Sequence, residues 1–179
     1  MSKQLVKRQT SEIATNTDEG QQYLTFSLGQ EMFAVGILNI REIIEYGSVT
    51  TVPMMPTFVR GVINLRGSVV PVIDLSARFG RVATEVARRT CIVVFEVEHE
   101  GVLQELGVMV DAVSEVLEIP ASDIEPPPAF GAKIRADFLS GMGKVQGKFV
   151  ILLNVGKVLA VDEMAMLSQL AEDEGKRRE

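Results

Sequence analysis

The chain has 179 residues with a formal net charge of −6, and 46% of its residues are hydrophobic. This apolar content is enough to build a folded core, and the negative charge has the wrong sign for binding phosphate backbones. The single cysteine excludes an internal disulfide and favours a reducing compartment, the cytoplasm. The N-terminus shows no signal peptide, and no apolar run approaches the roughly 20 residues of a membrane span.

In chain order, a polar segment, 1–21, shows no periodicity and is predicted to be a mobile tail. Residues 23–28 then alternate, turn at Gly29-Gln30 and resume at 32–35, which is the pattern of a β-hairpin. The next apolar residues have the spacing of a short helical stripe that precedes an extended run: Ile37, Ile40 and Ile44.

A second hairpin pattern covers residues 58–75 and ends at Asp74, a side chain able to cap a following helix. A short helix is therefore predicted over 75–79. The same order of predicted elements is repeated in the second half of the chain. The run 138–155 aligns with 58–75 without gaps, and Asn154 replaces Asp74 ahead of a second short helix over 155–159. Identical pairs in this alignment are Phe58 and Phe138, Gly61 and Gly141, Gly67 and Gly147, and Val70 and Val150.

The earlier elements repeat as well, since 91–97 with 106–110 resembles the first hairpin and 110–118 resembles 37–45. The chain therefore reads as an internal duplication with units at 22–88 and 89–160. About five short strands in each unit predict an all-β fold of two small barrels. The second unit is longer because of 124–135, whose triple proline predicts an extended loop, either a stiff connection or a polyproline ligand.

The last segment, 161–179, places Met164, Leu167 and Leu170 at helical spacing before a charged end. An amphipathic helix packed on the barrels is predicted over 161–172, followed by a frayed tail.

No constellation for catalysis is visible in the sequence. His99 is predicted to be exposed in a turn, and Cys91 to be an inert buried thiol. One histidine and one cysteine are too few for a zinc site. The glycines at 141, 143 and 147 precede a strand and not a helix, so they indicate turns and not a phosphate-binding loop. No enzyme activity, metal or cofactor is predicted.

One cluster of acidic residues and one cluster of arginines are each interpreted as solvent-exposed surface or partner contact and not as a binding site for a metal or a nucleic acid. Asp111, Glu115 and Glu118 have the spacing of one helix face, which favours a solvated acidic edge over a metal site. The arginines at 78, 81, 88 and 89 favour a solvated rim or a local partner contact over nucleic-acid binding.

The run 56–75, and above all its Asn64-Leu65-Arg66-Gly67 segment, closely resembles the CheW family of chemotaxis coupling proteins. Residues 37–43, 110–117 and 138–143 resemble further segments of that family, so that the resemblance covers about 22–170. It implies two SH3-like five-stranded barrels. It also implies a non-catalytic adaptor that joins methyl-accepting chemoreceptors to the histidine kinase CheA.

The implied partners are the regulatory domain of CheA and the cytoplasmic tips of the receptors, in arrays associated with the membrane. The resemblance places receptor binding in a groove lined by Ile37, Ile40, Glu42, Arg66 and Val116. Arg66 would donate hydrogen bonds to the receptor and Glu42 would hold it in place. The alternative is that the three apolar residues are core.

For the kinase, the resemblance suggests the end of the first unit, around Val49, Met54, Met55 and Phe58. Methionine adapts to partner surfaces, although the same residues are equally typical of a core. Two other functions remain open: an adaptor of a pilus-motility or biofilm pathway, and a small-barrel ligand or nucleic-acid binder. The second is disfavoured by the acidic charge and the absence of tryptophan.

Overall fold

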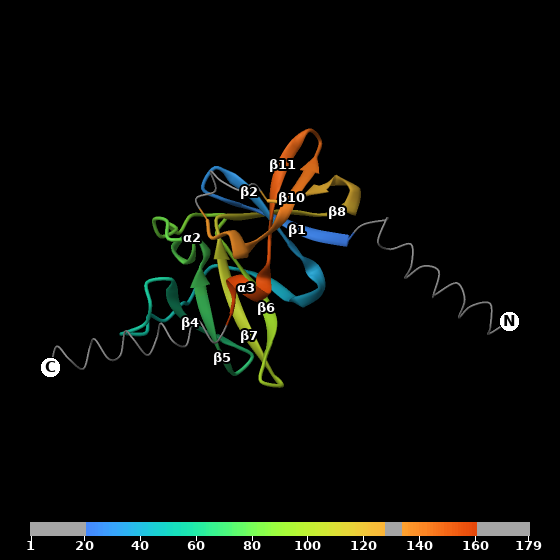
Figure 1. Ribbon diagram of the computed structural model, residues 1–179. Coiled ribbons are helices and arrows are strands. Elements are labelled where there is room, and N and C mark those ends of the chain that lie inside the picture. Colours follow the sequence, from blue (N-terminus) through green and yellow to red (C-terminus); the bar gives the residue numbers. More distant parts are fainter. Residues whose placement is uncertain (1–20, 128–133, 161–179) are drawn as a thin grey trace.

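The computed structural model describes residues 21–127 and 134–160, which form an all-β fold of short strands joined by single helical turns (Figure 1). The strands are β1 Gln21–Leu28, β2 Glu31–Gly36, β3 Ile40–Glu45, β4 Val59–Leu65, β5 Ser68–Asp74, β6 Cys91–His99, β7 Val102–Val110, β8 Ala112–Ile119, β9 Ile124–Glu125, β10 Leu139–Val145 and β11 Lys148–Leu153. The helical turns are η1 Ile37–Asn39, α2 Leu75–Arg78, η2 Ala121–Asp123, η3 Ala136–Phe138 and α3 Val155–Val158.

The strands form two sheets, and both close into barrels. The sheet with the order β3-β6-β7-β5-β4, here the first barrel, closes where Thr50 bridges to Val62 of β4 through two 2.8 Å hydrogen bonds. The sheet β8-β1-β2-β11-β10-β9, here the second barrel, closes where β8 continues through η2 into β9, which pairs with β10. Since β8 and β9 are one interrupted strand, each barrel has the five-stranded form expected for the chain.

The barrels exchange hairpins. Each sheet therefore contains strands from both sides of the predicted boundary at residue 88, and this boundary does not separate the two barrels. The hairpin β1–β2 lies in the second barrel, where β2 pairs in parallel with β11. The hairpin β6–β7 lies in the first barrel, where β7 pairs in parallel with β5. Each half of the chain therefore contributes its leading hairpin to the sheet of the other half, and neither half closes a barrel alone.

The duplication is visible in matched local structures. The hairpin β4–β5 turns at Arg66-Gly67 and β10–β11 turns at Gln146-Gly147, with positive φ at both residues of each turn. Such turns match the twist of the strands and favour glycine. The caps also match the prediction, since Asp74 accepts a hydrogen bond from the Ala77 amide and Asn154 accepts one from the Lys157 amide, both at 3.2 Å.

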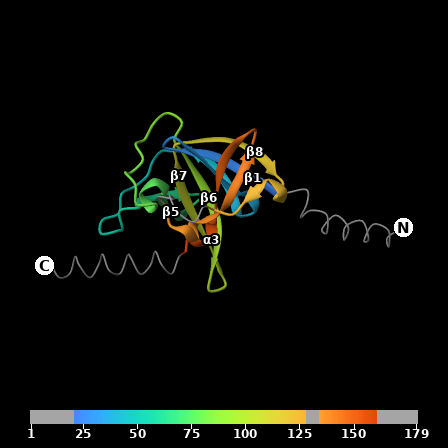
Figure 2. The ribbon, with the colours of Figure 1, turned by 45° about the horizontal axis from the view of Figure 1, so that its top comes forward.

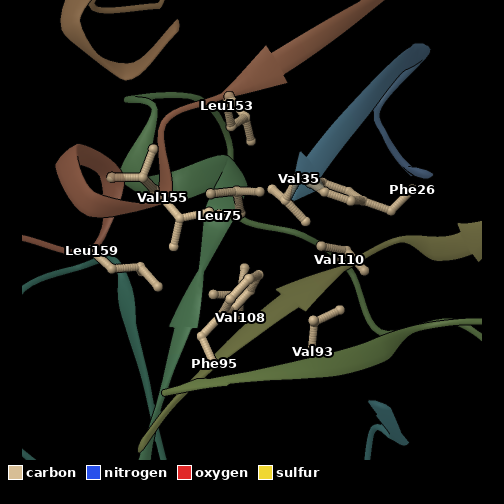
Figure 3. A pocket seen from close by; sticks show the side chains of 11 residues that line it. Phe26, Val35, Leu75, Val93, Phe95, Val108, Val110, Leu153, Val155 and Leu159 are labelled. Carbon is tan, nitrogen blue, oxygen red and sulfur yellow. The ribbon is translucent and has the colours of Figure 1, made fainter. Parts of the chain in front are cut away.

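The main core runs through both barrels. Phenylalanine rings follow one another through it, with centroid distances of 5.9 Å from Phe26 to Phe33, 5.7 Å from Phe33 to Phe79 and 6.0 Å from Phe79 to Phe138. Figure 3 shows apolar side chains from β2, β6, β7, β11 and α3 converging on a small cavity of about 20 Å³. An apolar space of this size has room for about one water molecule but offers it no polar partner, so it does not form a ligand site.

Two helical predictions were wrong. The stripe of Ile37, Ile40 and Ile44 is one 3-10 turn followed by strand β3, so only Ile37 is helical. Glu115 and Glu118 lie on strand β8 and Asp111 directly precedes it, so these three do not share a helix face. In the first place the spacing of Ile37 and Ile40 coincides with a 3-10 turn that enters strand β3. The predicted helix over 161–172 lies outside the described residues, as does half of the loop at 124–135, residues 128–133.

Candidate protein-interaction site

The candidate receptor surface is centred on an ion pair between Glu42 and Arg66. The Nη1 of Arg66 lies 2.7 Å from Oε1 of Glu42, and its Nη2 donates a 3.1 Å hydrogen bond to Oε2. Glu42 lies on β3 and Arg66 in the turn after β4, which are the first and last strands in the order of the first barrel. Closure of the barrel therefore brings together two side chains that are 24 residues apart in the chain.

This ion pair orients the arginine more than it stabilises the fold. The side chain of Arg66 is 74% exposed and that of Glu42 is 23% exposed. Exposed pairs contribute only about 0.2–1 kcal/mol to stability. A two-pronged contact does restrict the guanidinium to one geometry, and the high exposure leaves its other N–H donors accessible to a partner.

The apolar members of the predicted groove divide between core and surface. Ile37 and Ile40 are half-buried and pack against the main core. They lie where η1 carries the chain from β2 in the second barrel to β3 in the first. Val116 is 52% exposed on β8 of the second barrel. Among the five predicted residues, the structure shows a polar contact between Glu42 and Arg66. Val116 lies on the other barrel, opposite Leu24 of β1.

Sequence reasoning missed two exposed apolar residues close to Glu42 in the chain, of which Ile43 points to the opposite face of β3 from Glu42. Leu38 is 88% exposed between the half-buried isoleucines, and Ile43 is 42% exposed on β3. The predicted helical stripe comprised only Ile37, Ile40 and Ile44. The alternation of β3, in which residues 41, 43 and 45 are exposed, was the available signal for Ile43.

The predicted kinase surface needs one correction. Phe58 is only 6% exposed, and the guanidinium of Arg78 lies 5.1 Å from the centre of its ring, so Phe58 is a core residue. Val49 is half-buried against the smaller apolar cluster of the first barrel. Met55 is half-buried as well, whereas Met54 is 51% exposed in a loop with φ of 62°. The surface that remains from the prediction is centred on Met54.

Three other side chains differ from expectation. Arg78 was predicted to be a rim or partner-contact residue but is 8% exposed, and its Nε donates a 2.9 Å hydrogen bond to the Val158 carbonyl. Its guanidinium also lies 4.8 Å from the ring centre of Phe138, so it joins the two halves of the chain. Cys91 is half-buried, not fully buried, and its thiol donates to the Arg89 carbonyl. His99 is half-buried at the end of β6.

Across the part of the chain that the structure describes, no three histidine, cysteine, aspartate or glutamate side chains gather in a way that could hold a metal ion. None of the helices within 21–127 and 134–160 has the length and apolar character needed to cross a bilayer.

The two closed barrels define a small all-β module. The family model of the CheW-like domain matches residues 22–163. The chain belongs to the CheW family of chemotaxis scaffold proteins, whose fold comprises two SH3-like barrels.

Individual relatives agree with this assignment. The chain is 36% identical to Chemotaxis protein CheW of Klebsiella aerogenes over 152 residues, which cover 85% of this chain and 89% of that one. It is 31% identical to Protein FrzA of Myxococcus xanthus, over 82% of this chain and 90% of that one. The solved structure of scaffolding protein TtCheW from Thermoanaerobacter tengcongensis is similar with a TM-score of 0.68 and 36% identity, over 75% of this chain and 89% of that one.

Proposed function

We propose that this protein is a non-catalytic adaptor that couples methyl-accepting chemoreceptors to the histidine kinase CheA. It would act in the cytoplasm at receptor arrays associated with the membrane. The observation that carries the proposal is Arg66, an exposed arginine held in one geometry by Glu42 of β3, the strand that also carries the half-buried Ile40. Recognition of a helix by a groove requires this combination of apolar contact and polar orientation.

In this proposal the receptor tip packs against Leu38 and the exposed part of Ile37 and Ile40. Arg66 then donates hydrogen bonds to carbonyl or carboxylate oxygens of the receptor. The kinase regulatory domain binds at the loop of Met54, on a different part of the first barrel. Two separate surfaces allow one adaptor to bind both partners at the same time.

Arg66→Ala is expected to weaken receptor binding about tenfold or more, because a central arginine of an interface often contributes more than about 1.4 kcal/mol. The measurement is co-sedimentation of the purified protein with vesicles that carry receptor cytoplasmic domains. Its matched control is Gln146→Ala, since Gln146 occupies the equivalent turn of the second barrel with a φ of 51°, against 52° for Arg66.

The control is expected to bind the receptor normally, and both variants to keep their thermal stability within about 0.5 kcal/mol of one another. An Arg66→Ala protein that binds as well as Gln146→Ala would remove Arg66 from the receptor surface. An Arg66→Ala protein that unfolds much more easily would show a structural role instead.

Titration with the isolated regulatory domain of CheA tests the other half of the proposal. The wild-type chain is expected to bind saturably, and Met54→Ala to bind roughly threefold to tenfold more weakly through loss of apolar contact. Val82→Ala is a suitable control, because Val82 is an apolar residue that is 87% exposed in another loop. Absence of saturable binding by the wild-type chain would contradict CheA as the partner.

A further inference from the structure

Two adjacent arginines that the proposed function does not use lie near the end of the segment 81–90, which connects α2 to β6. Arg88 and Arg89, here called the arginine patch, are both exposed. Within residues 21–127 and 134–160, every other arginine contacts a carboxylate or a carbonyl group, whereas the guanidinium groups of these two contact neither. The arginine patch is therefore a local cationic surface on a chain whose net charge is −6.

The segment that carries the arginine patch is anchored at two buried threonines. Thr84 is 7% exposed and Thr90 is 3% exposed. The Thr84 amide donates a 2.9 Å hydrogen bond to Oδ2 of Asp74, and Nη1 of Arg60 donates a 3.2 Å hydrogen bond to the Thr84 carbonyl. The Thr90 hydroxyl accepts a 2.8 Å hydrogen bond from the Ala87 amide. Because both threonines are anchored, the backbone between them loses little conformational freedom when a partner binds.

The same network places the arginine patch beside the loop of Met54, the proposed kinase surface. The Tyr46 amide, at the start of that loop, donates a 3.1 Å hydrogen bond to the carbonyl of Thr90, the residue that follows the arginine patch. The Tyr46 hydroxyl accepts a 3.3 Å hydrogen bond from Nε of Arg60, whose Nη1 contacts the other threonine anchor. In both views of the molecule, this loop in teal and the segment in green project from the same side (Figures 1 and 2).

The loop and the segment supply complementary parts of one surface. Between residues 46 and 58 the loop contains no acidic or basic residue, and its Met54 is 51% exposed. The segment adds Val86, which is 49% exposed, directly before the arginine patch. Exposed apolar side chains together with arginine are the composition that protein interfaces favour. Val82, the control residue for Met54→Ala, lies at the other end of the segment, where its carbonyl accepts a hydrogen bond from Ser76 of α2.

We propose that the arginine patch extends the kinase surface and pairs with carboxylates of the partner that packs on Met54. This inference rests on the binding of CheA at that loop, as proposed above. It adds that the partner presents aspartate or glutamate side chains next to an apolar area. A nucleic acid fits less well, because the negative charge of the chain and the exposed Glu85 of the same segment oppose a phosphate backbone. Arginines at the rim of an interface act mainly by accelerating association through long-range attraction.

Titration of the full-length chain with the isolated regulatory domain of CheA provides the first test. A variant that combines Arg88→Ala with Arg89→Ala is expected to bind about threefold to tenfold more weakly, mostly through slower association. Its matched control combines Lys144→Ala with Lys148→Ala, which removes the same two positive charges from exposed positions of β10 and β11 in the second barrel. The control is expected to bind like the wild-type chain, and both double variants, which change only exposed side chains, to keep the wild-type melting temperature.

The salt dependence of binding provides the second test. The affinities of the wild-type chain and of the lysine control are expected to fall more steeply with ionic strength than that of the arginine variant, because salt screens the attraction that this variant has lost. Normal binding by the wild-type chain with no difference between the two double variants would overturn the inference alone. So would an arginine variant that binds CheA normally but fails to co-sediment with receptor vesicles. Absence of binding by the wild-type chain would overturn both the inference and the proposed function.

Discussion

Gly61→Ala is expected to destabilise the protein by about 3 kcal/mol or more, the largest effect expected for alanine at any of the described glycines. A Cβ at Gly61 would overlap the carbonyl oxygen of Thr50 and lie 2.8 Å from its carbonyl carbon. The φ of Gly61 is 153°, a conformation that residues with a side chain rarely adopt. Thr50 makes the bridge that closes the first barrel, so the clash cannot be relieved without opening that closure.

The equivalent glycine of the second barrel provides a graded comparison. A Cβ at Gly141 would lie 2.9 Å from the Glu125 carbonyl oxygen, at the closure between β9 and β10, so Gly141→Ala is expected to cost less than Gly61→Ala. Gly36→Ala is the control, because a Cβ at Gly36 meets no atom within 4 Å. Urea unfolding measures all three. An equal loss for Gly61→Ala and Gly36→Ala would show that close approach at the closure does not govern stability.

Local features of this fold were predictable from the sequence because their causes are local. Alternation, the glycines of the two turns and the capping side chains Asp74 and Asn154 each act within a few residues. Their agreement in two copies made the hairpins and the helical turns recognisable. The exchange of hairpins between barrels was not predictable, because β1–β2 and β6–β7 have similar alternating patterns, which do not indicate the sheet that each hairpin joins.

The candidate site shows the same limit. The pairing of Glu42 with Arg66 depends on barrel closure across 24 residues, so it was expected only from the family resemblance. Phe58 reads as part of an apolar loop in the sequence. Its burial follows from Arg78, which is held between Phe58 and Phe138 of the other half of the chain. The sequence pattern of one half of the chain therefore does not predict that Phe58 is buried.

Asp74 and its counterpart Asn154 differ in burial and in the number of hydrogen bonds that their side chains accept. Its carboxylate is 1% exposed, and in addition to capping α2 it accepts a 2.9 Å hydrogen bond from the Thr84 amide through Oδ2. Nη1 of Arg60 lies 3.7 Å from the same oxygen and donates to the Thr84 carbonyl. The buried charge thus attaches the segment after α2 to the first barrel. Asn154, its counterpart, is exposed and is recorded only as the cap of α3.

Asp74→Asn is therefore expected to destabilise the protein by about 2–4 kcal/mol. An amide has one oxygen, so its NH₂ group would face either the Thr84 amide or the Ala77 amide, both of which are donors. The reciprocal change, Asn154→Asp, keeps an acceptor at an exposed cap and is expected to alter stability by less than about 0.5 kcal/mol. Urea unfolding measures the stability of both variants, one of which replaces aspartate by asparagine and the other asparagine by aspartate. If Asp74→Asn were as mild as Asn154→Asp, the cap alone would account for Asp74, and the segment 81–90 would have to be held by other contacts.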